Sequence, residues 1–196
     1  TLVAAPRQHL SRNEKELIKQ GATPIGWKPA QRRQKDLDAT GTKKHGKSHF
    51  GYKLSINADN KYKVIREIET DTASTHDSQH FANVLDPCNT SRDVYADRAY
   101  PSEKHAAELK ARGYRNQIQR KGSRNHPLSE CQKRRNSRIA MTRARVEHVF
   151  GAMNQMGGKL IRTIGQARAN FAMIMMACCY NLKRLVYFRK AGIEAF

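Results

Sequence analysis

The stretch "DVYADRAYPSEKHAAELKARGYRNQIQRK", residues 93–121, decides the fold. It begins with a short apolar run, continues as a helical segment that Gly113 ends, and closes with a second short run around Ile118. We therefore expect a strand, a helix and a strand. With the flanking segments, the order becomes strand, strand, helix, strand, helix, strand, which predicts an α/β fold with a mixed sheet.

The segments just before this stretch predict a hairpin and a helix. Residues 49–60 ("HFGYKLSINADN") and 61–73 ("KYKVIREIETDTA") alternate apolar and polar side chains around the turn "ADNK". This alternation indicates two antiparallel strands. Residues 74–87 ("STHDSQHFANVLDP") begin with helix-start residues and end at Pro87, so we expect a helix there.

Two long helices are expected after residue 121. Ser129 is followed three residues later by Gln132, which is the pattern of a capping box, and helical spacing continues until Gly157. The second helix, at about 166–190, contains "FAMIMMACCYNL" (171–182) and is expected to be the most buried helix. Since this run is shorter than the roughly 20 apolar residues of a membrane span, we expect no membrane segment.

The chain is expected to have one main domain. Residues 1–46 mix Gly, Pro and charge, which suits a basic arm or linker, while residues 47–190 form the core and residues 191–196 a tail. No secretory signal is visible. The four cysteines lack C-x-x-C spacing, which favours reduced, structural thiols in a cytosolic protein.

The charge of the chain indicates a polyanionic partner. Its 37 Lys and Arg outnumber its 17 Asp and Glu, which gives a formal net charge of +20. The basic residues are spread along the whole chain, so the folded surface should carry a positive field. Nucleic acid is the natural partner of such a surface.

Two carboxylates are candidates for chemistry. Asp97 follows a short strand, where ligand-binding groups collect in open sheets, but it is equally suited to start the next turn. Glu147, in "RARVEHVFG" (143–151), lies at the edge of the apolar helix face, yet it could simply pair with Arg143 four residues earlier. Two such carboxylates can share divalent ions for phosphodiester chemistry. These residues alone leave both alternatives open.

A resemblance to a known family favours the chemical alternative. The runs "GTKKHGKSHFGYK", "TASTHDSQ", "VYADRAY", "KGSRNHPLSECQKRRN" and "RARVEHVFGAMNQMGGKLIRTIG" resemble, in this order, transposases of bacterial insertion sequences of the DDE class. The likeness runs from about residue 1 to 188. It implies a ribonuclease H-like catalytic core, in which three carboxylates hold two Mg²⁺ ions, or Mn²⁺ in their place, to cut and join DNA strands.

The resemblance assigns roles to individual residues. Asp97 matches the second acidic residue and Glu147 the third, so both are expected to be catalytic metal ligands. Arg143 matches the arginine of the family's helix signature and is expected to contact phosphate. Two positions depart from that signature, because Ala140 replaces its tyrosine and Asn154 its lysine.

The first acidic residue of the family has no match here. The resemblance places it two positions before Thr1, so the first strand is expected to be truncated and the family's N-terminal DNA-binding region absent. Asp36, Asp38 and Asp77 are not expected to replace it. This leaves open whether the chain cleaves DNA or is a catalytically dead remnant that only binds it.

DNA binding is expected from several basic residues. "TKKHGK" (42–47) is either a solvated loop or a phosphate-contacting one. The resemblance implies transposon ends and target DNA as partners, a homodimer on DNA, and a cytoplasmic, nucleoid-associated protein. A purely structural nucleic-acid binder is the third alternative. The residues expected to contact DNA are Arg143, Arg145, Lys43, Lys44, Lys47 and Lys53.

Overall fold

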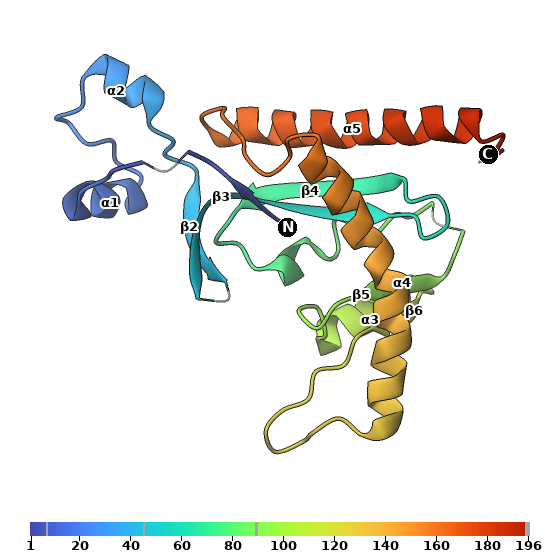
Figure 1. Ribbon diagram of the computed structural model, residues 1–196. Coiled ribbons are helices and arrows are strands. Elements are labelled where there is room, and N and C mark those ends of the chain that lie inside the picture. Colours follow the sequence, from blue (N-terminus) through green and yellow to red (C-terminus); the bar gives the residue numbers. More distant parts are fainter. Residues whose placement is uncertain (7, 45, 89, 195–196) are drawn as a thin grey trace. The chain divides into compact units, whose positions relative to one another are not determined.

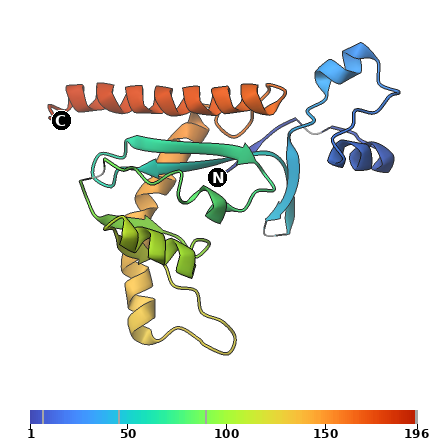
Figure 2. The ribbon, with the colours of Figure 1, turned by 180° about the vertical axis from the view of Figure 1, so that it is seen from behind.

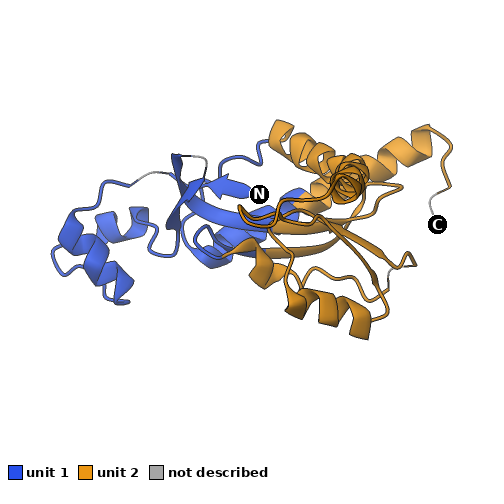
Figure 3. Cartoon of the chain, turned by 90° about the horizontal axis from the view of Figure 1, so that it is seen from below, with its two compact units in different colours: residues 1–54, 70–75, 157–176 blue, residues 55–69, 76–156, 177–196 orange. Residues whose placement is uncertain are grey.

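The computed structural model describes residues 1–6, 8–44, 46–88 and 90–194 (Figure 1). It divides the chain into two compact units (Figure 3). The first contains Thr1–Leu54, Thr70–Thr75 and Gly157–Met176, and the second contains Ser55–Glu69, His76–Met156 and Ala177–Phe196. Each unit is described below by itself.

Helices and strands alternate along the chain, as expected of a mixed α/β protein. The elements are β1 (Leu2–Ala4), α1 (Arg12–Lys19), α2 (Pro29–Gln34), β2 (Thr40–Lys44), β3 (Lys47–Ala58), β4 (Ile65–Thr72), the 3₁₀ helix η1 (Asp77–His80), β5 (Asp93–Ala96), α3 (Glu103–Ala111), β6 (Arg115–Ile118), α4 (Glu130–Gln155) and α5 (Gln166–Lys190).

The larger sheet is built around β3. β1 and β2 both pair with β3 in antiparallel register, and β4 pairs with β3 as well. The pairing of β3 with β4 confirms the expected hairpin. Its turn is closed by a bond from the Asp59 N–H to the Val64 carbonyl at 2.8 Å, and Lys63 adopts a positive φ of 59° there.

Residues 1–46 differ from the expected arm. β1 and β2 are strands of the sheet, and Val3, Ala5 and Asp36 are buried. The apolar start of the chain pairs with β3 as strand β1. Residues 1–46, whose Gly, Pro and charge suggested a linker, therefore begin and end with a strand of the sheet. At the other terminus, residues 191–194 form no helix or strand, and residues 195–196 lie outside the described part of the chain.

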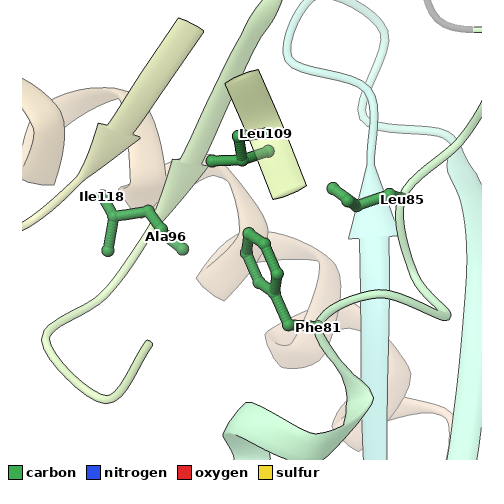
Figure 4. Packing of buried hydrophobic residues seen from close by; sticks show 5 residues of the cluster. All are labelled: Phe81, Leu85, Ala96, Leu109 and Ile118. Atoms are coloured by element: carbon green, nitrogen blue, oxygen red, sulfur yellow. The ribbon is translucent and has the colours of Figure 1, made fainter. Parts of the chain in front are cut away.

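The smaller sheet consists of β5 and β6, which are parallel, with Ala96 opposite Ile118. The helix α3 connects them, and Gly113 (φ 74°) follows its last turn, as the sequence predicted. Apolar side chains from both strands and from α3 gather around the ring of Phe81 (Figure 4). Because parallel strands end at the same edge, the residues after Ala96 and Ile118 leave the sheet together.

The helix expected over 74–87 is wrong. Only the single 3₁₀ turn η1 forms, followed by turns up to Leu85. The His76 side chain accepts a bond from the Ser78 N–H at 3.3 Å, and Asp86 accepts one from the Cys88 N–H at 2.8 Å. Such local side-chain bonds give the backbone an alternative to helical pairing. Phe81 and Leu85 are nevertheless buried in the cluster described above.

The long helix α4 begins as predicted. Ser129 and Gln132 form the reciprocal bonds of a capping box. Both views show α4 running past the β5–β6 pair (Figure 1, Figure 2). Its buried side chains include Ile139, Val149 and Met153. α4 therefore places side chains from one of its faces beside the carboxyl edge of the smaller sheet.

The helix α5 is less buried than expected. Its C-terminal half docks on the β3–β4 turn, where the Asn181 side chain bonds both backbone groups of Ile65 and the Tyr180 hydroxyl donates to the Lys63 carbonyl. By length and composition α5 is long and apolar enough to cross a membrane, with 22% of its most apolar window buried. Among the described helices α5 still carries the most buried side chains, Ala169, Met173, Ala177, Tyr180 and Phe188, but only one side of it is covered by the described residues. Apolar side chains exposed on it are Phe171, Ile174, Met175, Leu182, Leu185, Val186 and Tyr187.

The cysteines are free but not buried. Cys88, Cys131, Cys178 and Cys179 are all unpaired and all exposed. Their exposure does not fit a role as packed core thiols. Cys178 and Cys179 lie on the exposed part of α5, so their burial was overestimated for the same reason as that of the helix.

Candidate active site

The two candidate carboxylates come from different elements of the second unit. Asp97 follows the last residue of β5, at the carboxyl edge of the smaller sheet. Glu147 lies on α4, four residues after Arg143. The edge of a parallel strand pair and the helix beside it therefore supply one carboxylate each.

Arg143 joins these two carboxylates. Its Nη2 atom lies 2.7 Å from Glu147 Oε1, within hydrogen-bond distance, and 3.7 Å from Asp97 Oδ2. The exposed fractions of the side chains are 27% for Arg143, 35% for Asp97 and 58% for Glu147. One positively charged nitrogen thus lies between two carboxylate oxygens that are still open to solvent. The structure brings together the three residues that the sequence singled out.

Asp97 also fulfils its local structural alternative. Its Oδ1 atom accepts a bond from the Ala99 N–H at 2.8 Å, and its carbonyl accepts one from the Tyr100 N–H at 3.3 Å. These bonds form the turn after β5. They hold one oxygen of the carboxylate in the turn while the other faces Arg143. Asp97 can therefore start the turn and also belong to a catalytic site. The same holds for Glu147, which forms the predicted ion pair with Arg143.

Tyr100 is a site residue that the sequence reasoning missed. Burial raises the pKa of its hydroxyl well above the usual value, and the negative charges of Asp77 and Asp97 raise that pKa further. Arg143 and a hydrogen bond with Ser55 act in the opposite direction. Tyr100 is therefore a neutral hydroxyl beside the carboxylates, and Asp77 lies near enough to influence it. Its position three residues after Asp97, in "YADRAY", was the available signal.

The other aspartates that were weighed are structural. Asp36 is buried and accepts bonds at 2.8 Å from the Tyr52 hydroxyl and at 3.1 Å from the Ala39 N–H. Asp38 accepts the Gln166 N–H at 2.8 Å, at the start of α5. Both belong to the first unit and are engaged in fixing its backbone. They were not expected to hold metal, and their bonds give each a structural role.

The basic candidates fall in both units. On α4, Arg145 donates to the Asn60 carbonyl at 2.5 Å. In the first unit, Lys44 at the end of β2 lies opposite Lys47 at the start of β3, and Lys43 lies opposite Ser48. Lys43, Lys44 and Lys47 are exposed. Residues 42–47 are therefore the end of a β-hairpin, not a loop, with His45 outside the described residues. Like charges directly opposite each other destabilise a strand pair, so this hairpin end favours an anionic partner.

Lys53 differs from the other candidates. It is half-buried, and its Nζ atom donates to the Thr75 carbonyl. Among the described residues no group of three or more His, Cys, Asp and Glu side chains has the arrangement of a metal site. The carboxylate pair bridged by Arg143 is consequently the strongest candidate for chemistry in the described ranges.

An α/β chain that presents paired carboxylates beside basic residues has the features of a nucleic-acid-processing protein, and comparison with known proteins defines its family. Residues 19–182 match the family described as "Transposase DDE domain". This match covers most of the chain, and the chain belongs to that family.

One similar protein is the transposase for insertion sequence element IS1106 from Neisseria meningitidis serogroup B. It is 33% identical to this chain over 121 residues, which is 62% of this chain and 42% of that protein. The chain thus aligns with less than half the length of this relative. No solved structure matches the chain.

Proposed function

We propose that this chain is the catalytic core of a DDE transposase, with a ribonuclease H-like fold, that cleaves DNA at transposon ends and joins the strands to target DNA. The observation that carries this proposal is the contact of one Arg143 nitrogen with both Asp97 and Glu147. The family match supports the class of reaction, and the name of the similar protein supports an insertion sequence as its context.

The carboxylate pair fits divalent metal ions. Mg²⁺ and Mn²⁺ prefer oxygen ligands and are commonly bound by one or two carboxylates plus water. Asp97 and Glu147 supply such oxygens at a partly exposed position, and the guanidinium of Arg143 shows that a positive charge is stable between them. We propose that both residues hold Mg²⁺, or Mn²⁺, as two ions in the complete site. When bound, these ions polarise the phosphodiester and activate the attacking oxygen.

Several basic residues are proposed to bind DNA. Arg143 is proposed to contact a DNA phosphate beside the carboxylates, because a guanidinium has several N–H donors and can bind a phosphate while it faces Asp97 and Glu147. The turn bonds of Asp97 fix its carboxylate in one orientation. Lys43, Lys44 and Lys47 on the hairpin, with Lys53 and Arg145, are proposed to contact phosphates away from the cut.

The proposed function also suggests the partners, oligomeric state and cellular location of the protein. A net charge of +20 favours DNA as partner and association with the bacterial nucleoid in the cytoplasm. Two transposon ends must be processed together, so we propose a homodimer on DNA. We propose no membrane location, since one side of the apolar helix α5 is covered by protein at Ala169, Met173, Ala177 and Tyr180.

The test of this function is metal-dependent nicking of supercoiled plasmid DNA. In Mg²⁺ or Mn²⁺, Asp97→Asn and Glu147→Gln should each reduce the nicking rate by about 100-fold or more, because each removes a charged ligand from the reacting centre. Glu16→Gln is the matched control, since Glu16 is an exposed glutamate on α1 of the first unit that pairs with Arg12, and it should leave the rate unchanged.

Two results would contradict the proposal. Equal rates in the unchanged protein and both carboxylate variants would remove Asp97 and Glu147 from the reaction. No nicking by the unchanged protein in either metal would refute catalysis and would favour the remnant that only binds DNA.

A further inference from the structure

A second group of charges lies just after β6 and on the first half of α4, away from the carboxylate pair. The backbone of Arg120 is fixed there by Asn136, whose side chain is almost fully buried. Asn136 Oδ1 accepts the Arg120 N–H at 2.9 Å, and its Nδ2 donates to the Arg120 carbonyl at 2.9 Å. Gln119 donates to the Asn136 carbonyl at 3.1 Å. The exposed side chain of Arg120 therefore projects from a rigid anchor.

Arg135 adds a second guanidinium beside it. Its Nη1 atom donates to the Ile118 carbonyl at 3.0 Å and its Nη2 atom to the Asn116 carbonyl at 2.8 Å, so it covers the carboxyl end of β6. Arg120 and Arg135 line the same shallow depression. The anchoring bonds of Arg135 use backbone carbonyls, and no carboxylate of the described residues forms an ion pair with it.

Two more arginines extend this group along the helix. Arg134 and Arg138 are four residues apart and line a second shallow depression on α4 with Glu130, Lys133 and Ser137. Burial lowers the pKa of Arg135, and the charges of Arg120 and Arg138 lower it further. The four residues Arg120, Arg134, Arg135 and Arg138 are called the arginine cluster below.

Acidic side chains do not neutralise the arginine cluster. Glu130 pairs with Lys133 at 2.7 Å, and Glu103 lines the first depression without an ion pair to any arginine there. Across the described residues no carboxylate lies within ion-pair distance of the four arginines. Their mutual repulsion costs the folded state free energy, and a bound polyanion would relieve that cost.

We propose that the arginine cluster is a binding site for the phosphate backbone of duplex DNA, separate from the phosphate that Arg143 would meet. This proposal rests on the proposed function and specifies how the DNA is held. A single small anion would need one concave site, whereas the arginines line two depressions, one on α4 and one where Arg135 of α4 meets β6 and the start of α3. A row of phosphates matches this extended arrangement, and guanidinium groups bind phosphate through paired hydrogen bonds.

The geometry also gives the distance of this contact from the cut. Ala96 is opposite Ile118 in the smaller sheet, so Asp97 and Arg120 leave the same sheet edge. Asn136, which anchors Arg120, is seven residues before Arg143, or about 10 Å along α4. Duplex DNA rises about 3.4 Å per base pair, so for a duplex that runs along α4 we propose that the cluster contacts phosphates about three base pairs from the scissile one.

The experiment compares two double variants of equal charge change. Arg120→Gln/Arg138→Gln removes two charges from the cluster, and Lys104→Gln/Lys110→Gln removes two exposed charges from α3 in the same unit. Binding of a fluorescent duplex of random sequence is measured without divalent metal over a series of salt concentrations. Each lost phosphate contact lowers the slope of log K against log salt by about 0.9, so the cluster variant should lose about 1.8. The control variant should lose less than half of that.

The outcomes separate this proposal from the proposed function. Equal slopes for the two double variants would overturn the phosphate site, even if plasmid nicking still depends on Asp97. Tighter binding of single-stranded RNA than of duplex DNA of equal length would also overturn it. A reduced slope in the cluster variant alone supports the site, and it does so even if Asp97→Asn leaves nicking unchanged and the proposed catalysis is wrong.

Discussion

Arg143 can be interpreted in two ways, as a partner of Glu147 that stabilises α4 or as part of a catalytic site. An isolated, exposed pair of Arg143 and Glu147 at this spacing would stabilise α4 by only about 0.3–0.5 kcal/mol. The same guanidinium, however, also faces Asp97, which comes from the end of β5. An arginine that serves only to stabilise a helix has no need of a second carboxylate from the sheet. The paired contact therefore favours a site over simple charge balance.

A second residue pair, in the first unit, offers a test of local electrostatics. Glu14 Oε1 accepts a bond from Trp27 Nε1 at 2.5 Å, and this bond, followed by that from the Ser11 N–H, holds the pKa of Glu14 below its ordinary value of 4.5. A lowered pKa stabilises the folded state above the ordinary value, and this stabilisation is lost as the pH falls through the lowered pKa. Trp27 is the single tryptophan of the chain, so its emission reports this bond.

On acidification through the lowered pKa of Glu14, the emission of Trp27 should shift to longer wavelength as Glu14 is protonated and the indole loses its acceptor. In Glu14→Gln this transition should disappear. Glu16→Gln, on the same helix, changes an exposed glutamate that pairs with Arg12 and should keep the transition. An unchanged acid transition in Glu14→Gln would show that the Glu14 carboxylate does not control the emission.

At the scale of elements, the sequence predicted those whose signals are local. β5, α3, β6 and the start of α4 form where short apolar runs, Gly113 and the Ser129 capping box predicted them. The helix expected over 74–87 failed because His76 and Asp86 bond their neighbouring backbone instead. β1 was missed because it pairs with β3 residues far along the chain, and such pairing leaves no mark in a short window. β2 was missed because its sequence "TGTKK" lacks the alternation of apolar and polar residues that marks a strand.

The candidate site was predictable only where its contacts are local in the sequence. Arg143 and Glu147 are neighbours on one helix, so their contact follows from spacing alone. Asp97 reaches them only because the β5–β6 pair lies against α4, a tertiary arrangement that the resemblance implied and the periodicity did not. Tyr100 and the anchoring of Arg120 by Asn136 escaped prediction, because both depend on burial and on partners distant in the sequence.

The pairing of β1 with β3 depends on Gly51. This residue has a φ of 148°, and a Cβ atom there would lie 2.2 Å from the Val3 carbonyl oxygen and 2.6 Å from the Ala5 nitrogen. Gly51→Ala should therefore cost about 2–4 kcal/mol of unfolding free energy, measured by urea denaturation, because β1 must separate from β3.

The matched control for this substitution is Gly41→Ala in β2. A Cβ atom at Gly41 would have its nearest neighbour, the His49 carbonyl oxygen, at 3.8 Å, which is ordinary contact. We expect its effect to be below about 1 kcal/mol. Equal losses in the two variants would mean that β1 does not lie against Gly51 in solution.

At the scale of the whole molecule, charge and carboxylates have separate roles. The net charge of +20 is distributed over both units, on the β2–β3 hairpin end as well as on α4. Such a surface attracts DNA without regard to sequence. Acidic side chains weaken the attraction of such a surface for DNA, so a cluster of them suggests another role. Asp97 and Glu147 form such a cluster around Arg143. DNA binding by the basic surface and chemistry at the carboxylates should therefore respond to different substitutions.

The most direct test of the central claim is a titration of the protein with Mn²⁺, in which the free ion is followed by electron paramagnetic resonance. We predict that Asp97→Asn and Glu147→Gln each weaken binding by about tenfold or more, because each removes a ligand oxygen, while Glu130→Gln leaves it unchanged. Arg143→Gln should instead tighten binding, since it removes a positive charge that competes with the ion for both carboxylates. The same Mn²⁺ affinity in all four variants and the unchanged protein would contradict a metal site at Asp97 and Glu147.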